Sequence, residues 1–416
     1  MILNTKTTNG LPLDVKYCIK CNISNQRTTG KNEYFHTEKS IHKTIKFDDD
    51  GICAGCKYVE KEFDETIDWN ERERELKDLC DKFRKNNGEF DCLVPGSGGK
   101  DSVYASHVLK YKYKMNPLTV TWSPNLYTEI GWKNFQSWLH KGGFSNFLYT
   151  PNPKIHKLIT QEATKRLLHP FQTFIIGQKT FALKIAAKLN IPLIFYGESQ
   201  GKGGKTISHT AKSFSESKTQ AGFELDPLEG KDFKEVFLGG KQVAEYLEEG
   251  VPLSDLENYK PININLLKEK KLDFYYLGYF LRWVPQEMYY FASKNIDFSA
   301  NPERTEGTYT KYASLDDKID GFFYYTSYIK FGIGRAMFDS ANEIRHGHIT
   351  KEEGKALINK FDGEYPIKYE DEFLNYISMK KEDFQDLCDK FRPEHIWEKI
   401  DPQSIPASIN FTVRYS

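Results

Sequence analysis

A glycine-rich turn at residues 97–102, SGGKDS, has the residue types of a phosphate-binding loop. It follows the apolar run FDCLV, which predicts a buried strand, and it opens a helical pattern. Glycines let a backbone approach an anion closely, and the N–H groups at a helix start point toward it. The residues expected to bind the phosphates are Ser97, Gly98, Gly99, Lys100, Asp101 and Ser102.

The order of residues in this turn excludes one class of phosphate loop. A Walker A loop needs G-x-x-x-x-G-K followed by Ser or Thr, whose hydroxyl binds magnesium. Here Lys100 precedes Asp101, and Val94 stands where the first glycine is required. Lys100 would add positive charge, and Asp101 would orient the loop or a magnesium ion.

Four cysteines form two C-x2-C pairs near the start of the chain, Cys18 with Cys21 and Cys53 with Cys56. Four thiolates in two short pairs suit tetrahedral zinc, which would stabilise a segment that has few large apolar side chains. Redox dithiols or an iron site are the alternatives. The run GICAGC also matches a G-x-C-x-G glutaminase elbow, but no His-x-Glu follows it to supply a base, so the structural metal site is favoured.

The glycine turn and cysteines must be positioned by the elements around them, and short apolar runs alternate here with helical patterns. Such alternation predicts an α/β fold, a Rossmann-like parallel sheet with helices on both faces. The expected strands are 90–94, 117–122, 145–150 and 191–197, and the expected helices are 69–87, 101–113, 129–141 and two within 154–189. The repeated DLCDKFR at 78–84 and 386–392 is interpreted as two helices of similar amphipathicity.

The 416 residues are enough for two or three domains. We expect a zinc-binding module at 1–66, an ATP-binding α/β domain at 67–260 and a mainly helical C-terminal region at 261–416 that completes the site. Residues 199–230, rich in Gly, Ser and Lys, are expected to be a long loop, lid or disordered segment.

Charge and hydropathy limit the partners. Lys plus Arg and Asp plus Glu both number 58, which gives no global reason to expect long nucleic acid. The start lacks the pattern of a signal peptide, so the expected location is the cytoplasm. The apolar run at 274–284 is too short for a membrane span and contains Arg282, so it is expected to be buried core.

The block SGGKDS resembles the pyrophosphate-binding loop of the ATP pyrophosphatase (PP-loop) family, whose fold is adenine nucleotide alpha-hydrolase-like. This resemblance implies that the loop grips the β and γ phosphates of ATP while a substrate oxygen attacks the α phosphorus. Adenosine and acceptor are then expected at the ends of later strands, near Trp122, Ser123, Gly197 and Glu198. Glu198 is the candidate acid of that second site, with a helix-capping or structural role as the alternative.

The cysteine pairs, the loop, IFYGES, the block from TYTKYASLDD to KFGIGR, and EIRHGHIT together resemble the N-acetyl sugar amidotransferases of the WbpG and PseA type. The resemblance runs from about Tyr17 to the helix after Thr350. It implies work in bacterial surface-sugar biosynthesis, such as lipopolysaccharide O-antigen or the pseudaminic acid of flagellin. The implied reaction is ATP-dependent conversion of an acetamido group to an acetamidino group, which releases AMP and pyrophosphate.

This second resemblance also implies roles for the C-terminal block. Lys330 and Arg335 in KFGIGR are the candidate catalytic cations, together with Lys100 and Asp101 of the loop, and Arg345 is a weaker candidate. The alternative for KFGIGR is a glycine turn between two helices. Asp316 and Asp317 position the sugar or cap a helix, and His346 and His348 are expected to be exposed loop residues rather than metal ligands.

No glutaminase active site is visible in the sequence, so ammonia is expected from a separate subunit. The family resemblance implies HisH-like glutaminase and HisF-like partners, and an N-acetylated, nucleotide-linked sugar as substrate.

Two rival functions use the same motifs. A PP-loop tRNA thiolase would adenylate a base oxygen, but it would need a basic RNA face and catalytic cysteines beside the loop. The charge is balanced, and Cys80, Cys92 and Cys388 fall in predicted helices or a buried strand. A non-catalytic zinc-ribbon scaffold that keeps a nucleotide-binding fold is the other rival, and the intact loop argues against it.

Overall fold

The computed structural model describes residues 7, 9–29, 32–63, 66–199, 227–399 and 411–413. Its centre is a five-stranded sheet in the order β3-β2-β1-β4-β7, and every neighbouring pair is parallel. The strands are β1 (Cys92–Pro95), β2 (Pro117–Trp122), β3 (Ser145–Tyr149), β4 (Leu193–Tyr196) and β7 (Asp273–Tyr276). This order is that of a doubly wound α/β sheet. From β1 the chain first adds β2 and β3 on one side, and then adds β4 and β7 on the other side.

The sheet is buried on both faces because successive side chains of each strand point to opposite sides. Leu93 and Ile194 belong to one core, which α6 (Gln172–Leu189) covers. Val94 and Phe195 belong to the opposite core, which α2 (Trp69–Phe83) and α3 (Lys100–His107) cover. The predicted fold class, a parallel sheet with helices on both faces, is confirmed.

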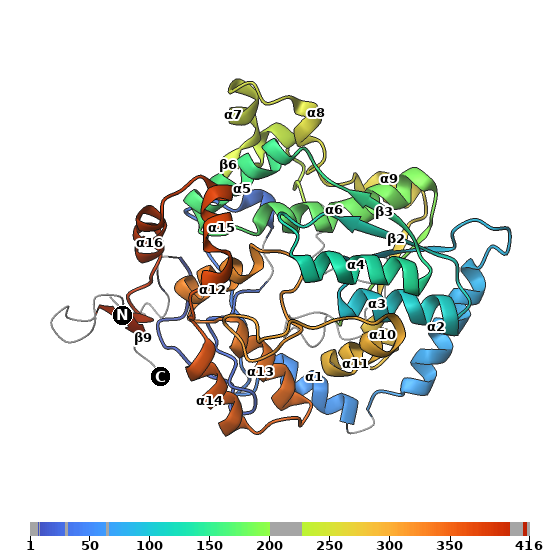
Figure 1. Cartoon of the computed structure of the whole chain (residues 1–416), viewed down its shortest axis with the longest axis horizontal. Coiled ribbons are helices and arrows are strands. Elements are labelled where there is room, and N and C mark those ends of the chain that lie inside the picture. Colours follow the sequence, from blue (N-terminus) through green and yellow to red (C-terminus); the bar gives the residue numbers. More distant parts are fainter. Residues whose placement is uncertain are drawn as a thin grey trace.

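The other helices surround this sheet and build the C-terminal region (Figure 1). They are α1 (Ala54–Phe63), α4 (Glu129–Gly142), α5 (Pro153–Leu167), α7 (Val243–Glu248), α8 (Leu253–Leu256), α9 (Ile264–Glu269), α10 (Leu277–Phe280), α11 (Pro285–Ile296), α12 (Asp320–Phe331), α13 (Arg335–Arg345), α14 (Lys351–Phe361), α15 (Glu370–Ile377) and α16 (Lys381–Lys390). Short 3-10 helices are η1 (Glu33–Phe35), η4 (Phe233–Glu235) and η5 (Ile367–Tyr369), and η2 (Val108–Lys112) is a π-helix. Two further pairs of strands are antiparallel: β5 (Phe237–Leu238) with β6 (Lys241–Gln242), and β8 (Trp397–Lys399) with β9 (Phe411–Val413).

The N-terminal segment packs against the C-terminal region, although the two lie at opposite ends of the chain. In Figure 1 its blue trace runs among the orange and red helices, with α1 beside α13. The cysteines share one core with Ile333, Met337 and Ala341, which lie in α13 or just before it. The N-terminal segment has few apolar residues of its own, and its hydrophobic core is therefore completed by side chains of α13.

The chain departs from the sequence-based picture in one element of the sheet. The run at 274–284 is buried, as expected, but its first residues form β7, which pairs with β4. The sheet thus takes its fifth strand from past residue 260, where the α/β domain was predicted to end. Residues 200–226, most of the predicted lid, lie outside the described residues. Among the described residues no helix is long and apolar enough to cross a membrane.

Candidate nucleotide site and cysteine cluster

The glycine turn connects β1 to α3 at the carboxyl edge of the sheet, where ligands of such sheets bind. Gly98 has φ +84°, and a Cβ there would lie 2.7 Å from Cα of Phe135 in α4. A Cβ on Gly96 would lie 2.2 Å from Cβ of Ser102. Because the turn is pressed between two helices, only glycine fits at these two positions.

The backbone of the turn offers donors to an anion. The N–H groups of Ser97, Gly98 and Gly99 donate to no acceptor in the part of the chain that the structure describes. The first N–H groups of α3 have no intrahelical partner either. Donors of this kind at a helix start attract phosphate.

The side chains of the turn are already engaged with each other. Nζ of Lys100 lies 2.5 Å from Oδ2 of Asp101, and Nε1 of Trp283 donates to Oδ1 of Asp101 at 3.2 Å. Ser102 is buried, and its hydroxyl donates to the carbonyl of Gly99 at 2.9 Å. Ser102 therefore fixes the turn, while Lys100 and Asp101 form a charged pair beside the backbone donors.

The other predicted nucleotide-binding residues lie at the same edge. Gly197 follows β4, and a Cβ there would lie 2.9 Å from the carbonyl oxygen of Asp101. Glu198 is exposed. Trp122 ends β2 but its indole is buried against Gly177, where a Cβ would lie 2.1 Å from Trp122 Cε2, and Ser123 is buried as well. All four residues lie at or near the carboxyl edge of the sheet. Their contacts with a nucleotide stay a prediction.

Lys330 lies at the end of α12, where Nζ donates to the carbonyl of Leu167 at 3.0 Å. Its charge acts on His169, whose pKa is lowered to about 3, first by burial. Glu33 lies nearby and accepts a hydrogen bond from Nε2 of Gln172 at 3.0 Å. Lys330 thus belongs to a buried polar cluster formed by the N-terminal segment, α6 and α12. The sequence did not predict this cluster, because its residues are far apart in the chain.

Arg335 begins α13 and is held inside the protein. Its Nε lies 3.1 Å and 3.3 Å from the two carboxylate oxygens of Asp339, and Nη1 donates to the hydroxyl of Tyr324. Asp339 also accepts from the hydroxyl of Thr308 at 2.7 Å. In this arrangement Arg335 orders the segment around Thr308, and its catalytic role stays a prediction.

The glycines of KFGIGR form a turn between two helices. Gly332 has φ +63° and ends α12, and Gly334 precedes α13. The backbone of Gly334 is approached closely by Asp362, whose Oδ2 accepts from its N–H at 3.1 Å. A side chain of the protein, rather than a ligand, fills the space that this glycine leaves.

Asp317 joins the C-terminal region to the loop after β2. Its carboxylate accepts from the backbone N–H of Asn125 at 2.6 Å, from Asn125 Nδ2 at 2.8 Å and from the N–H of Leu126 at 3.4 Å. It also accepts from the N–H of Ile319 at 2.9 Å, at the start of α12. Buried and engaged in this way, Asp317 works as a clamp between two segments and binds the N–H of Ile319, the residue before α12, whereas Asp316 is half-buried beside it.

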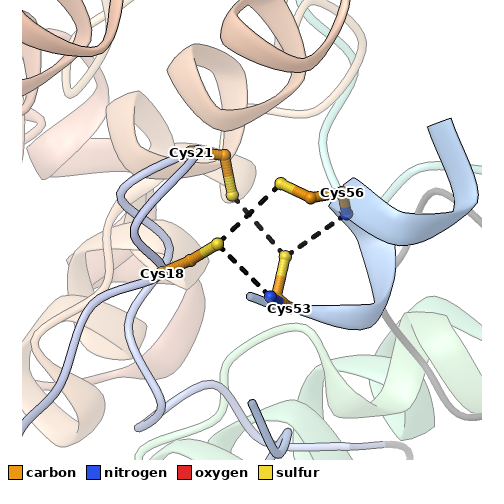
Figure 2. Close-up of side chains that lie close together, drawn as sticks. All are labelled: Cys18, Cys21, Cys53 and Cys56. Atoms are coloured by element: carbon orange, nitrogen blue, oxygen red, sulfur yellow. Dashed lines mark hydrogen bonds between the residues drawn. The ribbon is translucent and has the colours of Figure 1, made fainter. Parts of the chain in front are cut away.

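The four paired cysteines meet at one point, as predicted from their spacing. Figure 2 shows their sulfur atoms directed toward one another. The sulfurs are 3.8 Å apart in Cys18 and Cys56 and 3.6 Å apart in Cys21 and Cys53, and all four lie within 4.8 Å of one another. The backbone N–H of Cys53 donates to the sulfur of Cys18 at 3.3 Å, which orients that sulfur.

These distances fit a single tetrahedral ion. Metal–sulfur bonds of about 2.3 Å give sulfur–sulfur edges of about 3.8 Å. In an iron–sulfur cluster the thiolates bind different iron atoms, so they stand farther apart. The cluster could therefore hold one metal ion with four thiolate ligands.

Arg345, at the end of α13, completes the surroundings of the cysteines. Its Nη2 donates to the sulfur of Cys21 at 3.3 Å and lies 3.6 Å from the sulfur of Cys53. A Cβ on Gly55 would lie 2.9 Å from Cζ of Arg345, so the glycine in CAGC makes room for the guanidinium. Arg345 thus lies beside the thiolates, and its role as a weaker candidate for a catalytic cation stays a prediction.

The two histidines of EIRHGHIT lie in the turn after α13. His348 is exposed and its Nδ1 lies 2.6 Å from Oε2 of Glu343, and Nδ1 of His346 lies 2.7 Å from the carbonyl oxygen of Asn342. Among the described residues the four cysteines are the one group arranged to hold a metal.

Residues 306–410 match the family model of the LPS biosynthesis protein WbpG-like, C-terminal domain. This match, to a C-terminal domain, supports the resemblance of the chain to the WbpG type. The WbpG-like domain carries Lys330, Arg335 and Arg345, and Arg345 brings it into contact with the N-terminal cysteines.

Two further proteins resemble parts of the chain. An uncharacterized protein of Methanocaldococcus jannaschii, MJ1599, is 34% identical over 85 residues, which are 20% of this chain and 29% of that protein. The chain therefore spans less than a third of that relative. The U34-tRNA thiolase NcsA from Methanococcus maripaludis, solved with its [4Fe-4S] cluster, matches 70% of this chain and 80% of its own at 12% identity and a TM-score of 0.28. The strand order, rather than this distant likeness, identifies the fold class.

Proposed function

We propose that the protein is an ATP-dependent amidotransferase that converts the acetamido group of a bacterial surface sugar into an acetamidino group. The WbpG-like domain supports work in lipopolysaccharide biosynthesis. The observation that carries the proposal is the turn itself, where backbone N–H donors and the Lys100–Asp101 pair lie together at the carboxyl edge of a doubly wound sheet.

The reaction suits a loop that binds pyrophosphate. The carbonyl oxygen of the acetamido group attacks the α phosphorus of ATP, and the bond to the β phosphate breaks to release pyrophosphate. Ammonia then adds to the activated carbon, AMP leaves with the original oxygen, and loss of a proton gives the amidine. Charge develops on pyrophosphate in the first step, so donors fixed in advance by the loop stabilise it.

Each residue of the loop has a distinct task in this proposal. The N–H groups of Ser97, Gly98 and Gly99 hold the β and γ phosphates, and Lys100 neutralises charge on the leaving pyrophosphate. Asp101 would hold a magnesium ion, which would supply charge neutralisation at the phosphates. Lys330 and Arg335 are proposed to act on the acceptor side.

We assign the cysteine cluster to zinc, because sulfur separations of 3.6 and 3.8 Å match a tetrahedral ion. Four thiolates around a divalent ion keep a net negative charge, and the guanidinium of Arg345 offsets part of it. The ion would stabilise the fold without taking part in the reaction. Ammonia would come from a separate HisH-like glutaminase with a HisF-like subunit.

The remaining cysteines argue against the thiolase alternative. Burial raises the pKa of Cys80 to about 12 and that of Cys388 to about 12, and it raises the pKa of Cys92 as well. A thiol with a raised pKa is a poor nucleophile at neutral pH. All three lie in hydrophobic cores rather than beside the loop.

The experiment is to incubate the protein with ATP, magnesium, ammonium and a panel of nucleotide-linked and free N-acetyl sugars. AMP and a sugar in which NH replaces oxygen are the expected products. Lys100→Ala and Asp101→Ala should abolish AMP release while metal content stays at the wild-type level. AMP release from both variants at the wild-type rate would refute the role of the loop, and thiolation of tRNA without any sugar turnover would refute the reaction.

A further inference from the structure

A cavity of about 590 Å³ lies between α11, the segment 309–312 and the turn after α13. Its volume is in the range of small-molecule sites. Its walls combine the rings of Tyr290, Tyr309 and Tyr312 with the side chains of Glu287 and Glu343. No residue predicted from the sequence to bind ligand lies among its walls.

The cavity borders the phosphate loop. Nζ of Lys100 lies 5.9 Å from the centre of the Tyr312 ring. On another side, the hydroxyl of Thr310 is 3.4 Å from Oδ2 of Asp339, the carboxylate that pairs with Arg335. A ligand in the cavity would therefore lie between the loop and the proposed acceptor-side cation.

The tyrosines give the cavity flat apolar walls with polar edges. Tyr312 is fixed by stacking on Tyr289, with ring centres 4.7 Å apart and planes at 17°. The hydroxyl of Tyr309 is buried and has no hydrogen-bond partner in the described part of the chain. A buried hydroxyl without a partner loses its hydrogen bond to water, so a bound ligand that accepts or donates there would restore it. Aromatic faces and a few placed polar groups are the usual means of holding a sugar ring.

The charges of the cavity define what it accepts. Oε2 of Glu343 pairs with Nδ1 of His348 at 2.6 Å, and Oε1 lies 3.5 Å from the hydroxyl of Tyr312. Glu287 adds a second carboxylate. Carboxylates accept hydrogen bonds from hydroxyl groups but repel phosphates, so the cavity suits an uncharged polyol ring.

We propose that this cavity binds the acetamido-sugar ring of the acceptor. The ring lies against the tyrosines, its hydroxyls donate to Glu343 and bond the Tyr309 hydroxyl, and the acetamido group lies at the Tyr312 end, beside Lys100. Any nucleotide handle stays outside, away from the carboxylates. This assignment rests on the proposed function and adds the residues that select the sugar.

Three substitutions test the assignment by steady-state kinetics with the acetamido sugar that the wild type turns over. Tyr309→Phe removes a hydroxyl that makes no bond in the described protein, so folding should be unchanged while KM for the sugar rises about 3- to 10-fold. Glu343→Gln should raise that KM about 10- to 100-fold, because it removes a charged acceptor. Tyr290→Ala, at an exposed ring, should raise it several-fold. KM for ATP should stay within about twofold in all three.

The control is Glu248→Gln, a matched change at an exposed glutamate of α7, which should leave both KM values unchanged. If the wild type amidinates a sugar and Tyr309→Phe, Glu343→Gln and Tyr290→Ala all keep the wild-type KM for it, the cavity is not the acceptor site and the proposed reaction stands.

If no sugar is turned over, the proposed reaction is wrong. A binding measurement then tests separately whether the cavity is a sugar site. Saturation-transfer NMR with methyl N-acetyl-β-glucosaminide and with N-acetylglucosamine linked to UDP would then be measured on the wild type and on Tyr290→Ala. A signal that Tyr290→Ala weakens supports a sugar site. A signal of equal strength in both proteins, or none in either, overturns it.

Discussion

Arg345 donates from Nη2 to the sulfur of Cys21 at 3.3 Å, and 324 positions separate the two residues in the sequence. This contact ties the last turn of α13 to the cysteine cluster. Since Arg335 begins the same helix, the proposed metal centre and the Arg335–Asp339 pair lie at opposite ends of one rigid element.

Arg345→Met should weaken metal binding about 10- to 100-fold, the usual effect of losing a group that orients a ligand. The methionine keeps the bulk of the side chain but removes the positive charge that offsets part of the charge of the thiolates. Competition with a chromogenic chelator gives the affinity. Arg74→Met, at an exposed ion pair with Glu71, is the control and should bind metal like the wild type. Equal metal affinity in both variants would mean that the guanidinium packs beside the cysteines without contributing to metal binding.

Removing the metal should loosen α13 before it loosens the sheet. Ile333, Met337 and Ala341 share a core with the cysteines, so that core loses its support when the thiolates separate. Hydrogen exchange measured by mass spectrometry, with and without chelator, should show faster exchange in peptides from 333–345 and unchanged exchange in peptides from β1 and β2. Unchanged exchange throughout would show that the C-terminal region docks independently of the metal.

Gly98→Ala should destabilise the protein, whereas Gly99→Ala should not. Gly98 has φ +84°, a conformation that costs a non-glycine residue about 1–3 kcal/mol, and its Cβ would press on the backbone of Phe135. Gly99 has φ −67°, and a Cβ there meets only Ser97 Oγ at 3.9 Å. Chemical denaturation of the two variants gives their free energies of unfolding. A loss of the same size in both would contradict the conformation of the turn.

His156 should make the protein less stable in acid. Burial lowers its pKa to about 3 from an ordinary 6.5. Its Nε2 lies 2.7 Å from Oδ1 of Asn125, and its Nδ1 lies 2.8 Å from the hydroxyl of Tyr259. Because the unfolded chain binds a proton that the folded one does not, stability is full above about pH 6.5 and falls toward pH 3, with a slope of about 1.4 kcal/mol per pH unit.

Denaturation curves between pH 3.5 and 7.5 measure this effect by comparison of the wild type with His156→Gln. The variant lacks the titrating ring and should show a shallower decline, even if it starts from a lower stability. Parallel curves would mean that His156 carries no proton difference between the folded and unfolded states.

Local patterns were enough to predict the strands β1 to β4, the helices between them and the meeting of the four cysteines. Apolar runs, helical periodicity and the C-x2-C spacing are each contained in a short stretch of chain. β7 was missed because it has four residues, lies in an aromatic stretch and is followed at once by α10. A strand this short is recognisable only from β4, the neighbour with which it pairs.

The site could be predicted only where its residues are close in sequence. The turn at 97–102 was recognised because a strand, glycines and a helix start adjoin. The contact of Arg345 with Cys21 spans 324 positions, that of Asp362 with Gly334 spans 28, and the cavity at Tyr309 is lined by residues from Gln286 to Ile349, so no local pattern indicates them. The one available hint was Gly55 in CAGC, whose missing side chain makes room for Arg345.

The clamp at Asp317 bears on how WbpG-like domains can be exchanged between proteins. The matched region, 306–410, includes Asp317, but two of the residues whose N–H groups it accepts from, Asn125 and Leu126, lie in the α/β part of the chain. A graft of this domain onto another host would bury the carboxylate without those donors, at a cost of about 1–3 kcal/mol for each unsatisfied group. A working chimaera would have to transplant the loop after β2 together with the domain, because these two segments form one structural unit although they are far apart in the chain.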